Sequence, residues 1–271
     1  MNWLLRNFTR LYGGMWALTA VVFLLAPGPA RAGAVSCCIL AVAAFYVLGG
    51  RRLSRAAGRG LVEFYRDCDP VPLLENCDQL LRGAGERCAE GGVLSLRADR
   101  AACLLALGRL EEAEEELNRL SAALSGKKTS TTAVVCRGDR IALALDRGRL
   151  QGLEGEIEGV RAMLVRVRVP SQFAGLSFPE LMEWCLEGYS CRLLLGTAGP
   201  VPQLAVRLRA LLERPPCTLY QVQAAARLAE YHLARGEEAS ALPCLRLAAR
   251  TGGRLACALW AGDKLSRMGE E

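Results

Sequence analysis

The chain has 271 residues, of which 52% are hydrophobic and only 6% aromatic, and its mean hydropathy is +0.18. Ala, Leu, Arg and Glu dominate, which favours helices over a β-sandwich or barrel, and the apolar content excludes a disordered chain. The single histidine, His232, excludes a His-pair metal site and any mechanism that needs two histidines.

The net charge of +6 is distributed unevenly along the chain. Residues 1–60 contain seven Arg and no acidic residue, whereas residues 61–271 contain 27 basic and 28 acidic residues. The excess positive charge therefore belongs to the apolar N-terminal part, as in a membrane anchor joined to a nearly neutral globular domain. A nucleic-acid-binding protein would carry its basic patch on the folded domain, so we expect no nucleic acid partner.

Two uncharged apolar stretches, residues 11–26 and 32–50, are separated by the sequence PGPAR. A membrane-spanning helix needs about 20 apolar residues, and the first stretch approaches this length if it extends to Pro29. We therefore predict a transmembrane hairpin within residues 1–50, with spans at about 11–29 and 32–50. Arginines flank the hairpin on both outer sides, so both termini and the domain that follows are expected in the cytoplasm of a cell-membrane protein.

A secretory signal peptide is the alternative interpretation of the first stretch. Arg6 and Arg10 would form its basic start, and Ala30, Arg31 and Ala32 would form its cleavage site. In this alternative the second stretch still spans the bilayer, and the rest of the chain still faces the cytoplasm.

Residues 51–65 are predicted to form a basic linker helix, weakened by Gly58 and Gly60. A helical-repeat domain over residues 66–271 is expected to follow, and an irregular first helix pair near residues 70–90 should cap it.

The twelve cysteines include no Cys-x-x-Cys spacing, so the sequence offers no zinc site. Most of them lie among Ala and Leu, where a thiol behaves as a small apolar side chain. We expect them to be reduced packing residues.

A helix, a turn glycine and a second helix recur four times after residue 90. The turn glycines are spaced 40, 48 and 40 residues apart, at Gly108, Gly148, Gly196 and Gly236. A helix–turn–helix unit that recurs in this way is typical of an α-solenoid. Two loops interrupt the pattern, a polar one at residues 126–132 and a proline-bounded one at 169–179. The five glutamates between residues 111 and 116 are interpreted as a solvated helix face.

Two of these units, with the sequences ALGRLEEAEEEL and LARGEEASALPCL, resemble tetratricopeptide repeats, in which small residues let the paired helices approach closely. The matching positions are Ala101, Gly108, Ala113 and Leu120 in one unit and Ala229, Gly236, Ala241 and Ala248 in another. Ile141, Gly148, Leu153 and Val160 match more weakly. The spacing exceeds the family's 34 residues, Leu replaces most of its aromatic positions, and no unit ends in its usual proline.

The resemblance implies that the first helix of each pair lines a concave surface that binds a protein or peptide partner. The candidate groove residues are Ala102, Leu105, Ala142, Leu145, Glu230 and Leu233. The sequence contains no phosphate-binding loop, dinucleotide fingerprint, zinc-protease motif or nucleophile elbow, so we expect no catalytic residue, no metal and no cofactor. His232 is interpreted as a structural histidine.

The sequence thus predicts an all-α protein that acts as a membrane-anchored interaction scaffold, whose partners are the lipid bilayer and a protein or peptide. One alternative is an accessory subunit of a transport or secretion complex, in which the hairpin is the interface. The small side chains of Cys37, Cys38, Ala41, Ala43 and Ala44 suit close helix contact. The other alternative is an unrecognised helical enzyme, which a group of buried acidic residues with shifted pKa values would indicate.

Overall fold

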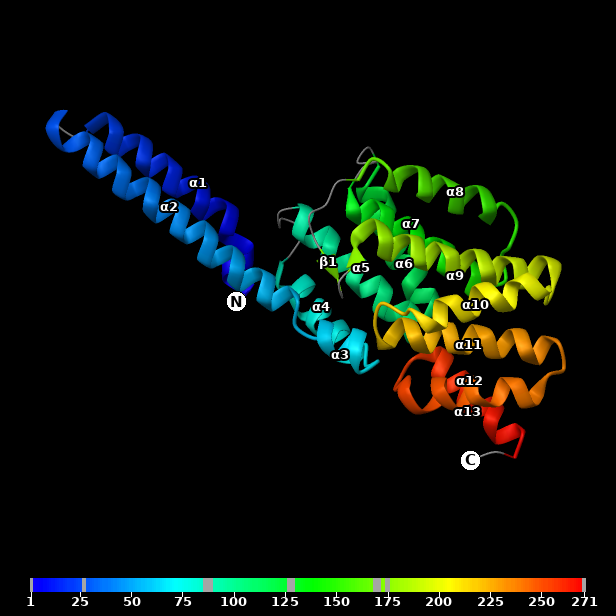
Figure 1. Ribbon diagram of the computed structural model, residues 1–271. Helices are drawn as coiled ribbons and strands as arrows, with labels where there is room; N and C mark the ends of the chain where they lie inside the picture. The colour runs from blue at the N-terminus through cyan, green and yellow to red at the C-terminus, as the bar shows by residue number, and fades with distance from the viewer. Residues whose placement is uncertain are drawn as a thin grey trace. The chain divides into compact units, whose positions relative to one another are not determined.

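The computed structural model describes residues 2–25, 28–84, 90–125, 130–167, 172–173 and 176–269. Over these residues the protein is helical except for one two-stranded antiparallel hairpin, which confirms the predicted all-α class (Figure 1). The chain forms two compact units. Unit 1 comprises Met1–Arg59 and Asn76–Leu96, and unit 2 comprises Gly60–Glu75 and Arg97–Glu271. The two units are therefore interleaved along the chain.

In unit 1, α1 (Asn2–Leu25) and α2 (Gly28–Ala57) pack side by side as an antiparallel hairpin (Figure 1). Thr19 and Val42 are buried, and the Thr19 hydroxyl donates a hydrogen bond to the Met15 carbonyl at 2.8 Å. The break between the helices lies earlier than predicted, because α2 already includes Pro29 in its first turn, where a proline sacrifices no helical hydrogen bond. Residues 26–27 of the first predicted span lie outside the described residues.

Among the residues that the structure describes, no helix has both the length and the apolar composition required to cross a membrane.

The predicted linker helix over residues 51–65 is divided in two. α2 ends at Ala57, and a short helix, α3 (Leu61–Arg66), begins after Gly60. Gly60 has a φ of +88°, and a Cβ at this position would lie 2.5 Å from the backbone nitrogen of Leu73. The chain therefore turns here by a conformation that a side chain would obstruct.

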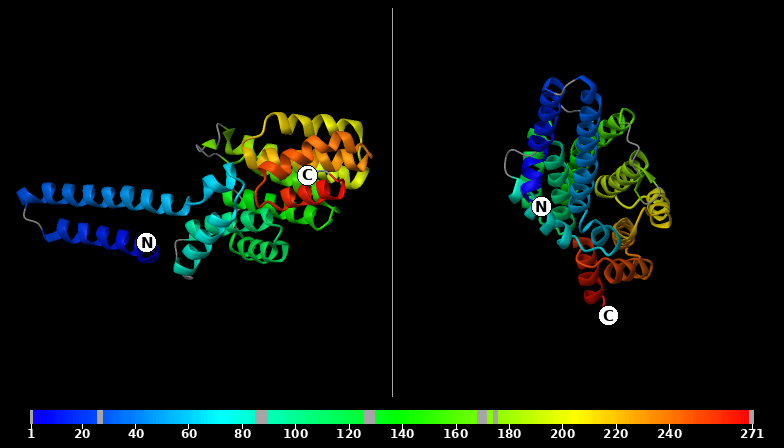
Figure 2. Two further views of the ribbon diagram at one scale, coloured as in Figure 1. Left: turned by 90° about the horizontal axis from the view of Figure 1, so that it is seen from below. Right: turned by 90° about the vertical axis from the view of Figure 1, so that its left-hand side faces the viewer.

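Unit 2 is a stack of helix pairs, which Figure 2 shows from two sides. The last three pairs lie within residues 131–164, 178–213 and 218–251. The first helix of each pair packs on the first helix of a neighbouring pair. The second helix of each pair packs on the helix that follows it in the chain. The remaining helices are α4 (Val71–Ala84), α5 (Glu90–Ala106), α6 (Leu110–Ala123), α7 (Thr131–Asp146), α8 (Leu153–Leu164), α9 (Phe178–Ala198), α10 (Pro202–Glu213), α11 (Thr218–Ala234), α12 (Glu238–Thr251) and α13 (Ala256–Arg267).

Small and aliphatic side chains fill the space within the pairs. Ala101, Ala113, Ala229 and Ala241 are completely buried. Two larger groups of buried side chains form the core between α7, α8 and α9 and the core between α9, α10 and α11. Burial of this apolar surface is the main force that holds the stack together.

Three of the four predicted turn glycines are confirmed, since Gly108, Gly148 and Gly236 end their helices with φ near +70°. The prediction for Gly196 is wrong. It lies inside α9, where a Cβ would meet the Leu150 side chain at 2.8 Å, and the turn is made by Gly199 instead. The periodic spacing of glycines therefore concealed a packing glycine.

The proline-bounded loop expected at residues 169–179 contains β1 (Gln172–Phe173) and β2 (Leu176–Ser177), which pair antiparallel. Ser177 then caps α9, because its hydroxyl accepts a hydrogen bond from the Glu180 amide and the Glu180 carboxylate accepts one from the Ser177 amide. Residues 169–171 and 174–175 of this loop, and residues 126–129 of the polar loop, lie outside the described residues.

Candidate functional site

The six candidate groove residues lie on three of the first helices of the pairs. Ala102 and Leu105 are half-buried on α5, Ala142 is half-buried on α7, and Leu233 is half-buried on α11. Leu145 belongs to the buried core around α7 and α8, so its side chain is not available to a partner. Of these helices, α7 and α11 both pack on α9.

Glu230 is half-buried and is part of an ion-pair network that joins α7, α9 and α11. Its carboxylate accepts a hydrogen bond from Arg227 at 2.6 Å. Arg192 of α9 pairs with Asp146 of α7 at 2.5 Å, and Arg227 lies 3.9 Å from the same carboxylate. Burial and the nearby Arg227 lower the pKa of Arg192. Two arginines and two carboxylates balance in this network, so it holds the first helices together without excess charge.

A second group of polar side chains was not among the candidate residues. We call it the acidic–aromatic cluster, and it consists of Tyr65, Asp99, Asp139, Trp184, Tyr189 and Tyr220. Five helices contribute to it, namely α3, α5, α7, α9 and α11.

Aromatic rings connect one side of the acidic–aromatic cluster. The ring centroids of Trp184 and Tyr220 are 5.0 Å apart, and those of Tyr65 and Tyr220 are 6.3 Å apart. Burial, followed by the nearby Cys185, raises the pKa of Tyr220 well above its ordinary value. Tyr65 comes from α3, which packs on α11, so a helix near the start of unit 2 supplies part of the cluster.

Two carboxyl groups form the other side. Burial raises the pKa of Asp99 to about 6. Burial, followed by the negative charge of Asp99, raises the pKa of Asp139 to about 7. Both carboxyls act electrostatically on Tyr65, whose pKa is raised by burial first and by these charges second.

The members of the acidic–aromatic cluster are all half-buried rather than fully buried. Surrounding protein nevertheless desolvates them strongly enough to raise the pKa values of Tyr189 and Tyr220 well above normal. Within the cluster, the Oδ2 atom of Asp139 and the Nε1 atom of Trp184 are buried and have no hydrogen-bond partner among the described residues. We therefore take this cluster as the candidate binding site.

A repeated sequence signal accompanies the two acids. Arg-x-Asp-Arg occurs at residues 97–100 and again at 137–140, so that Asp99 and Asp139 each lie nine residues before a turn glycine. The corresponding residue before Gly236 is Arg227. Trp184 and Tyr189 also share one helix in a chain with few aromatics. These signals could have identified the site from the sequence.

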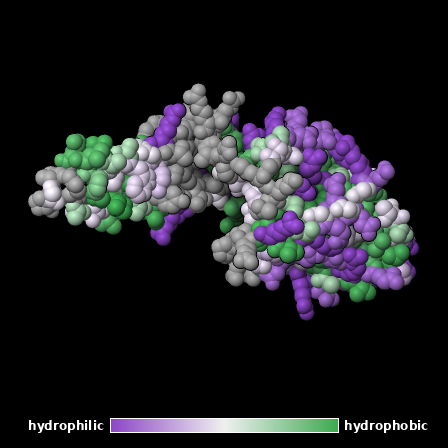
Figure 3. Space-filling model, turned by 90° about the horizontal axis from the view of Figure 1, so that it is seen from above, coloured by the Kyte–Doolittle hydropathy of each residue, from purple (hydrophilic) through white to green (hydrophobic). Residues whose placement is uncertain are grey.

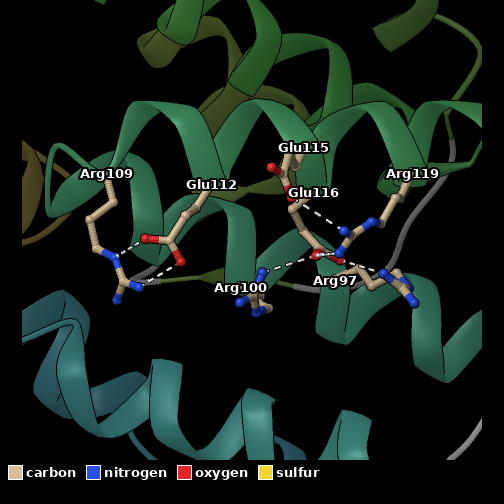
Figure 4. Close-up of polar contacts among 7 residues, drawn as sticks. All are labelled: Arg97, Arg100, Arg109, Glu112, Glu115, Glu116 and Arg119. Atoms are coloured by element: carbon tan, nitrogen blue, oxygen red, sulfur yellow. Dashed lines mark hydrogen bonds and ion pairs between the residues drawn. The ribbon is translucent and has the colours of Figure 1, made fainter.

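The acidic run at the start of α6 corrects another prediction. Four of its five glutamates lie at the surface or are only half-buried, but Glu116 is 2% exposed. Figure 4 shows its carboxylate pointing toward Arg97 and Arg100, which donate hydrogen bonds at 2.7 and 2.9 Å. Arg119 lies 3.6 Å away on the same helix. Glu116 is buried because these arginines replace the solvation that it loses.

His232 lies in the last turn of α11. It is buried, and its Nδ1 lies 2.7 Å from the Glu237 carboxylate across the turn between α11 and α12. The hydrogen bond from His232 is the largest cause of the lowered pKa of Glu237. None of the eleven described cysteines forms a disulfide, and six of them are buried. Within the described part of the chain, no group of three His, Cys, Asp or Glu side chains could hold a metal ion.

Comparisons of this chain with protein-family models, with curated proteins and with solved structures give no match.

Proposed function

We propose that this protein is a membrane-anchored interaction scaffold of the tetratricopeptide-like kind. The hairpin of α1 and α2 would hold it at the cytoplasmic face of the cell membrane. The first helices of the repeats would bind a protein or peptide partner. The observation that carries the proposal is the concentration of large exposed apolar side chains on the hairpin.

Ten of the fourteen large hydrophobic side chains that are exposed among the described residues belong to α1 and α2. Figure 3 shows hydrophobic colouring on much of the described hairpin surface, whereas hydrophilic colouring dominates the visible repeats. Apolar surface of this extent requires a covering, and the arginines that flank the uncharged stretches favour a bilayer as that covering. The ten residues are Trp16, Leu18, Val21, Phe23, Leu24, Leu25, Ile39, Leu40, Val47 and Leu48.

The repeat unit supports the second half of the proposal. Its first helices carry half-buried side chains of mixed character, including Ala102, Leu105 and Leu233. Such a surface suits a peptide or a helix better than a phosphate ligand. Anchoring would raise the local concentration of this surface near other membrane proteins, which favours a role in assembly.

The membrane anchor is tested by extraction of cell membranes with alkaline carbonate. We expect the full-length protein to remain in the pellet and the variant Leu24→Arg, Leu40→Arg to be released, because a charge in the hydrocarbon core costs about 3 kcal/mol or more. The matched control is Val206→Arg, Leu259→Arg, which alters exposed apolar side chains of the repeats. Release of the unaltered protein would contradict the anchor.

Partner binding is tested by photocrosslinking from single positions in the full-length chain in its native membrane. We expect crosslinks to one partner from Leu105 and Leu233, and none from the control positions Val206 and Leu259. Absence of a crosslink from both test positions would contradict a partner on the first helices.

The accessory-subunit function is the second candidate, and one observation favours it. Cys37, Ala41 and Ala44 are small and exposed at helical spacing on α2, which would allow another membrane helix to approach closely. Crosslinks from Ala44 but not from the repeats, together with loss of assembly in Ala41→Leu, would select this function.

An enzyme is less well supported, although the raised pKa values of Asp99 and Asp139 are the feature expected of one. Burial also raises the pKa of the neighbouring Cys185 thiol to about 12 and that of Tyr189 well above normal. The Cys185 thiol and the Tyr189 hydroxyl therefore stay protonated near neutral pH, and both are poor nucleophiles and poor bases in that state. The cluster is therefore better suited to binding.

A further inference from the structure

The carboxylates of the repeats differ in whether they have a cationic partner. Those of Glu116, Asp146, Glu187 and Glu230 all pair with arginine. Asp99 and Asp139 form no ion pair within the described residues, and no basic group is among the causes of their raised pKa values. In a chain with 34 basic residues, these two acids are left uncompensated.

Two polar atoms of the acidic–aromatic cluster are also without partners. The Oδ2 atom of Asp139 and the Nε1 atom of Trp184 are buried and form no hydrogen bond among the described residues. An unpaired buried acceptor costs about 1–3 kcal/mol. The cost is removed if a ligand supplies a donor, so Asp139 marks the place where such a donor would bind.

The aromatic side chains specify the kind of donor. Tyr65, Trp184 and Tyr220 contact one another in a series, and Tyr189 lies within the electrostatic reach of Asp139. Aromatic faces attract cations, and an organic cation loses less hydration than a metal ion when it binds against a ring. Ca²⁺ and Mg²⁺ instead require six or more oxygen ligands, which two carboxyls do not provide.

We infer that the acidic–aromatic cluster binds a lysine or arginine side chain of the peptide partner, between the carboxylates of Asp99 and Asp139 and the rings of Tyr65, Trp184 and Tyr220. The inference rests on the proposed function of the repeats, and it adds the chemistry of the residue that is recognised. The ammonium or guanidinium group donates to Asp139 Oδ2 and neutralises a site that otherwise carries only negative charge.

Binding of this cation depends on pH. Around Asp139 the ionisable groups are Tyr65 of α3, Asp99 of α5, Cys185 and Tyr189 of α9, and Cys136 of α7 itself. Burial raises the pKa values of the tyrosine and cysteine groups, so they remain neutral, and only the two carboxyls change charge between about pH 5 and 8. Protonation of these carboxyls at acid pH removes the attraction.

The experiment uses the full-length protein in detergent micelles, with ¹⁵N-labelled tryptophan. Three short peptides, acetyl-Gly-Lys-Gly-amide and its arginine and norleucine versions, are titrated while the indole N–H signal of Trp184 is followed. We expect a saturable shift with the lysine or the arginine peptide at about pH 8, a tenfold or larger loss of affinity at about pH 5, and no shift with the neutral norleucine peptide.

Variants identify the residues that bind the probe. Asp139→Asn and Asp99→Asn should each weaken binding about tenfold or more, whereas Asp263→Asn, at an exposed acid of α13, should not change it. Replacement of a destabilising buried charge should not impair folding, and circular dichroism of each variant checks this.

Three outcomes would overturn the inference: no saturable shift with either cationic peptide, equal binding of the norleucine peptide, or full affinity in both Asp variants. Equal affinity for butylammonium would show a site for small amines and would also overturn the assignment to a peptide. Photocrosslinking from Leu105 and Leu233 does not depend on these acids, so a failure here is distinguishable from a failure of the scaffold function.

Discussion

Glu116 and Asp139 are both acidic residues of unit 2, but their surroundings have opposite consequences. The carboxylate of Glu116 is inaccessible to solvent and accepts hydrogen bonds from Arg97 and Arg100. Asp139 lies near another acid and has no basic partner within the described residues. Loss of the first carboxylate should therefore destabilise the fold, whereas loss of the second should stabilise it.

Replacement of Glu116 by Ala should lower the free energy of unfolding by about 3–5 kcal/mol, because three arginines would lose the charge that compensates them. Glu112→Ala is the matched control on the same helix. Its ion pair with Arg109 is exposed on both sides, so its loss should cost less than about 1 kcal/mol. Urea unfolding of the full-length chain measures both, and equal losses would contradict the structural role of Glu116.

Asp139→Asn should raise stability in a pH-dependent manner. The pKa of Asp139 is raised from 3.8 to about 7 in the folded state, so the folded state holds its proton more tightly than the unfolded state does. The protonated carboxyl of Asp139 therefore contributes to the free energy of unfolding below about pH 4. That contribution is lost as the pH rises through about 7. Asn has no proton to lose, so the variant should gain about 1–3 kcal/mol at about pH 8 and almost nothing at about pH 4. Urea midpoints at the two pH values test this, and a gain that is equal at both would show that ionisation is not the cause.

At the scale of helices and turns, the glycines of this chain have different structural roles. Gly236 turns the chain between α11 and α12, and a Cβ added there would meet open space. Gly60 precedes α3, and a Cβ added there would collide with the backbone of Leu73. Gly196 has neither role, since it makes room for the Leu150 side chain. A glycine therefore indicates a close approach or a turn, and only the surrounding elements show which.

Gly60→Ala should destabilise the protein by about 3 kcal/mol or more, because the added Cβ would collide with backbone atoms that cannot rotate away. Gly236→Ala should destabilise the protein by only about 1 kcal/mol. The added Cβ meets no neighbour there, and the only cost is the left-handed backbone conformation that alanine must adopt. Thermal unfolding followed by circular dichroism compares the two. A Gly60 variant as stable as the Gly236 variant would show that the turn before α3 relaxes easily.

At the scale of the whole molecule, the charge distribution separates the hairpin from the repeats. All seven arginines of residues 1–60 lack acidic neighbours in the sequence, while the rest of the chain is nearly neutral. Arg51, Arg52, Arg55 and Arg59 follow the second apolar stretch directly. Under the proposed function these four residues keep the repeats in the cytoplasm.

Replacement of these four arginines by Gln should allow part of the protein to insert in the opposite orientation. The measurement is a C-terminal fusion to a reporter that is active only in the cytoplasm, compared with one that is active only outside it. Four arginines of the repeats that lie at the surface, Arg109, Arg119, Arg149 and Arg267, provide the matched control. An unchanged orientation in the first variant would contradict the role of the flanking charges.

The sequence by itself determined the helical class, two apolar helical segments near the N-terminus, and three of the four turn glycines, Gly108, Gly148 and Gly236. Those features depend on local propensity and on periodicity, which a single chain displays directly.

Only the tertiary structure decided which polar side chains meet. Tyr65 joins Asp99, Asp139, Trp184 and Tyr220 although these residues are separated by up to 155 positions in the chain. It also showed that Glu116 is buried with arginines and that Leu145 belongs to the core. Periodicity indicates which face of a helix is buried, but the packing of other helices determines how deeply a charge lies and whether another charge compensates it.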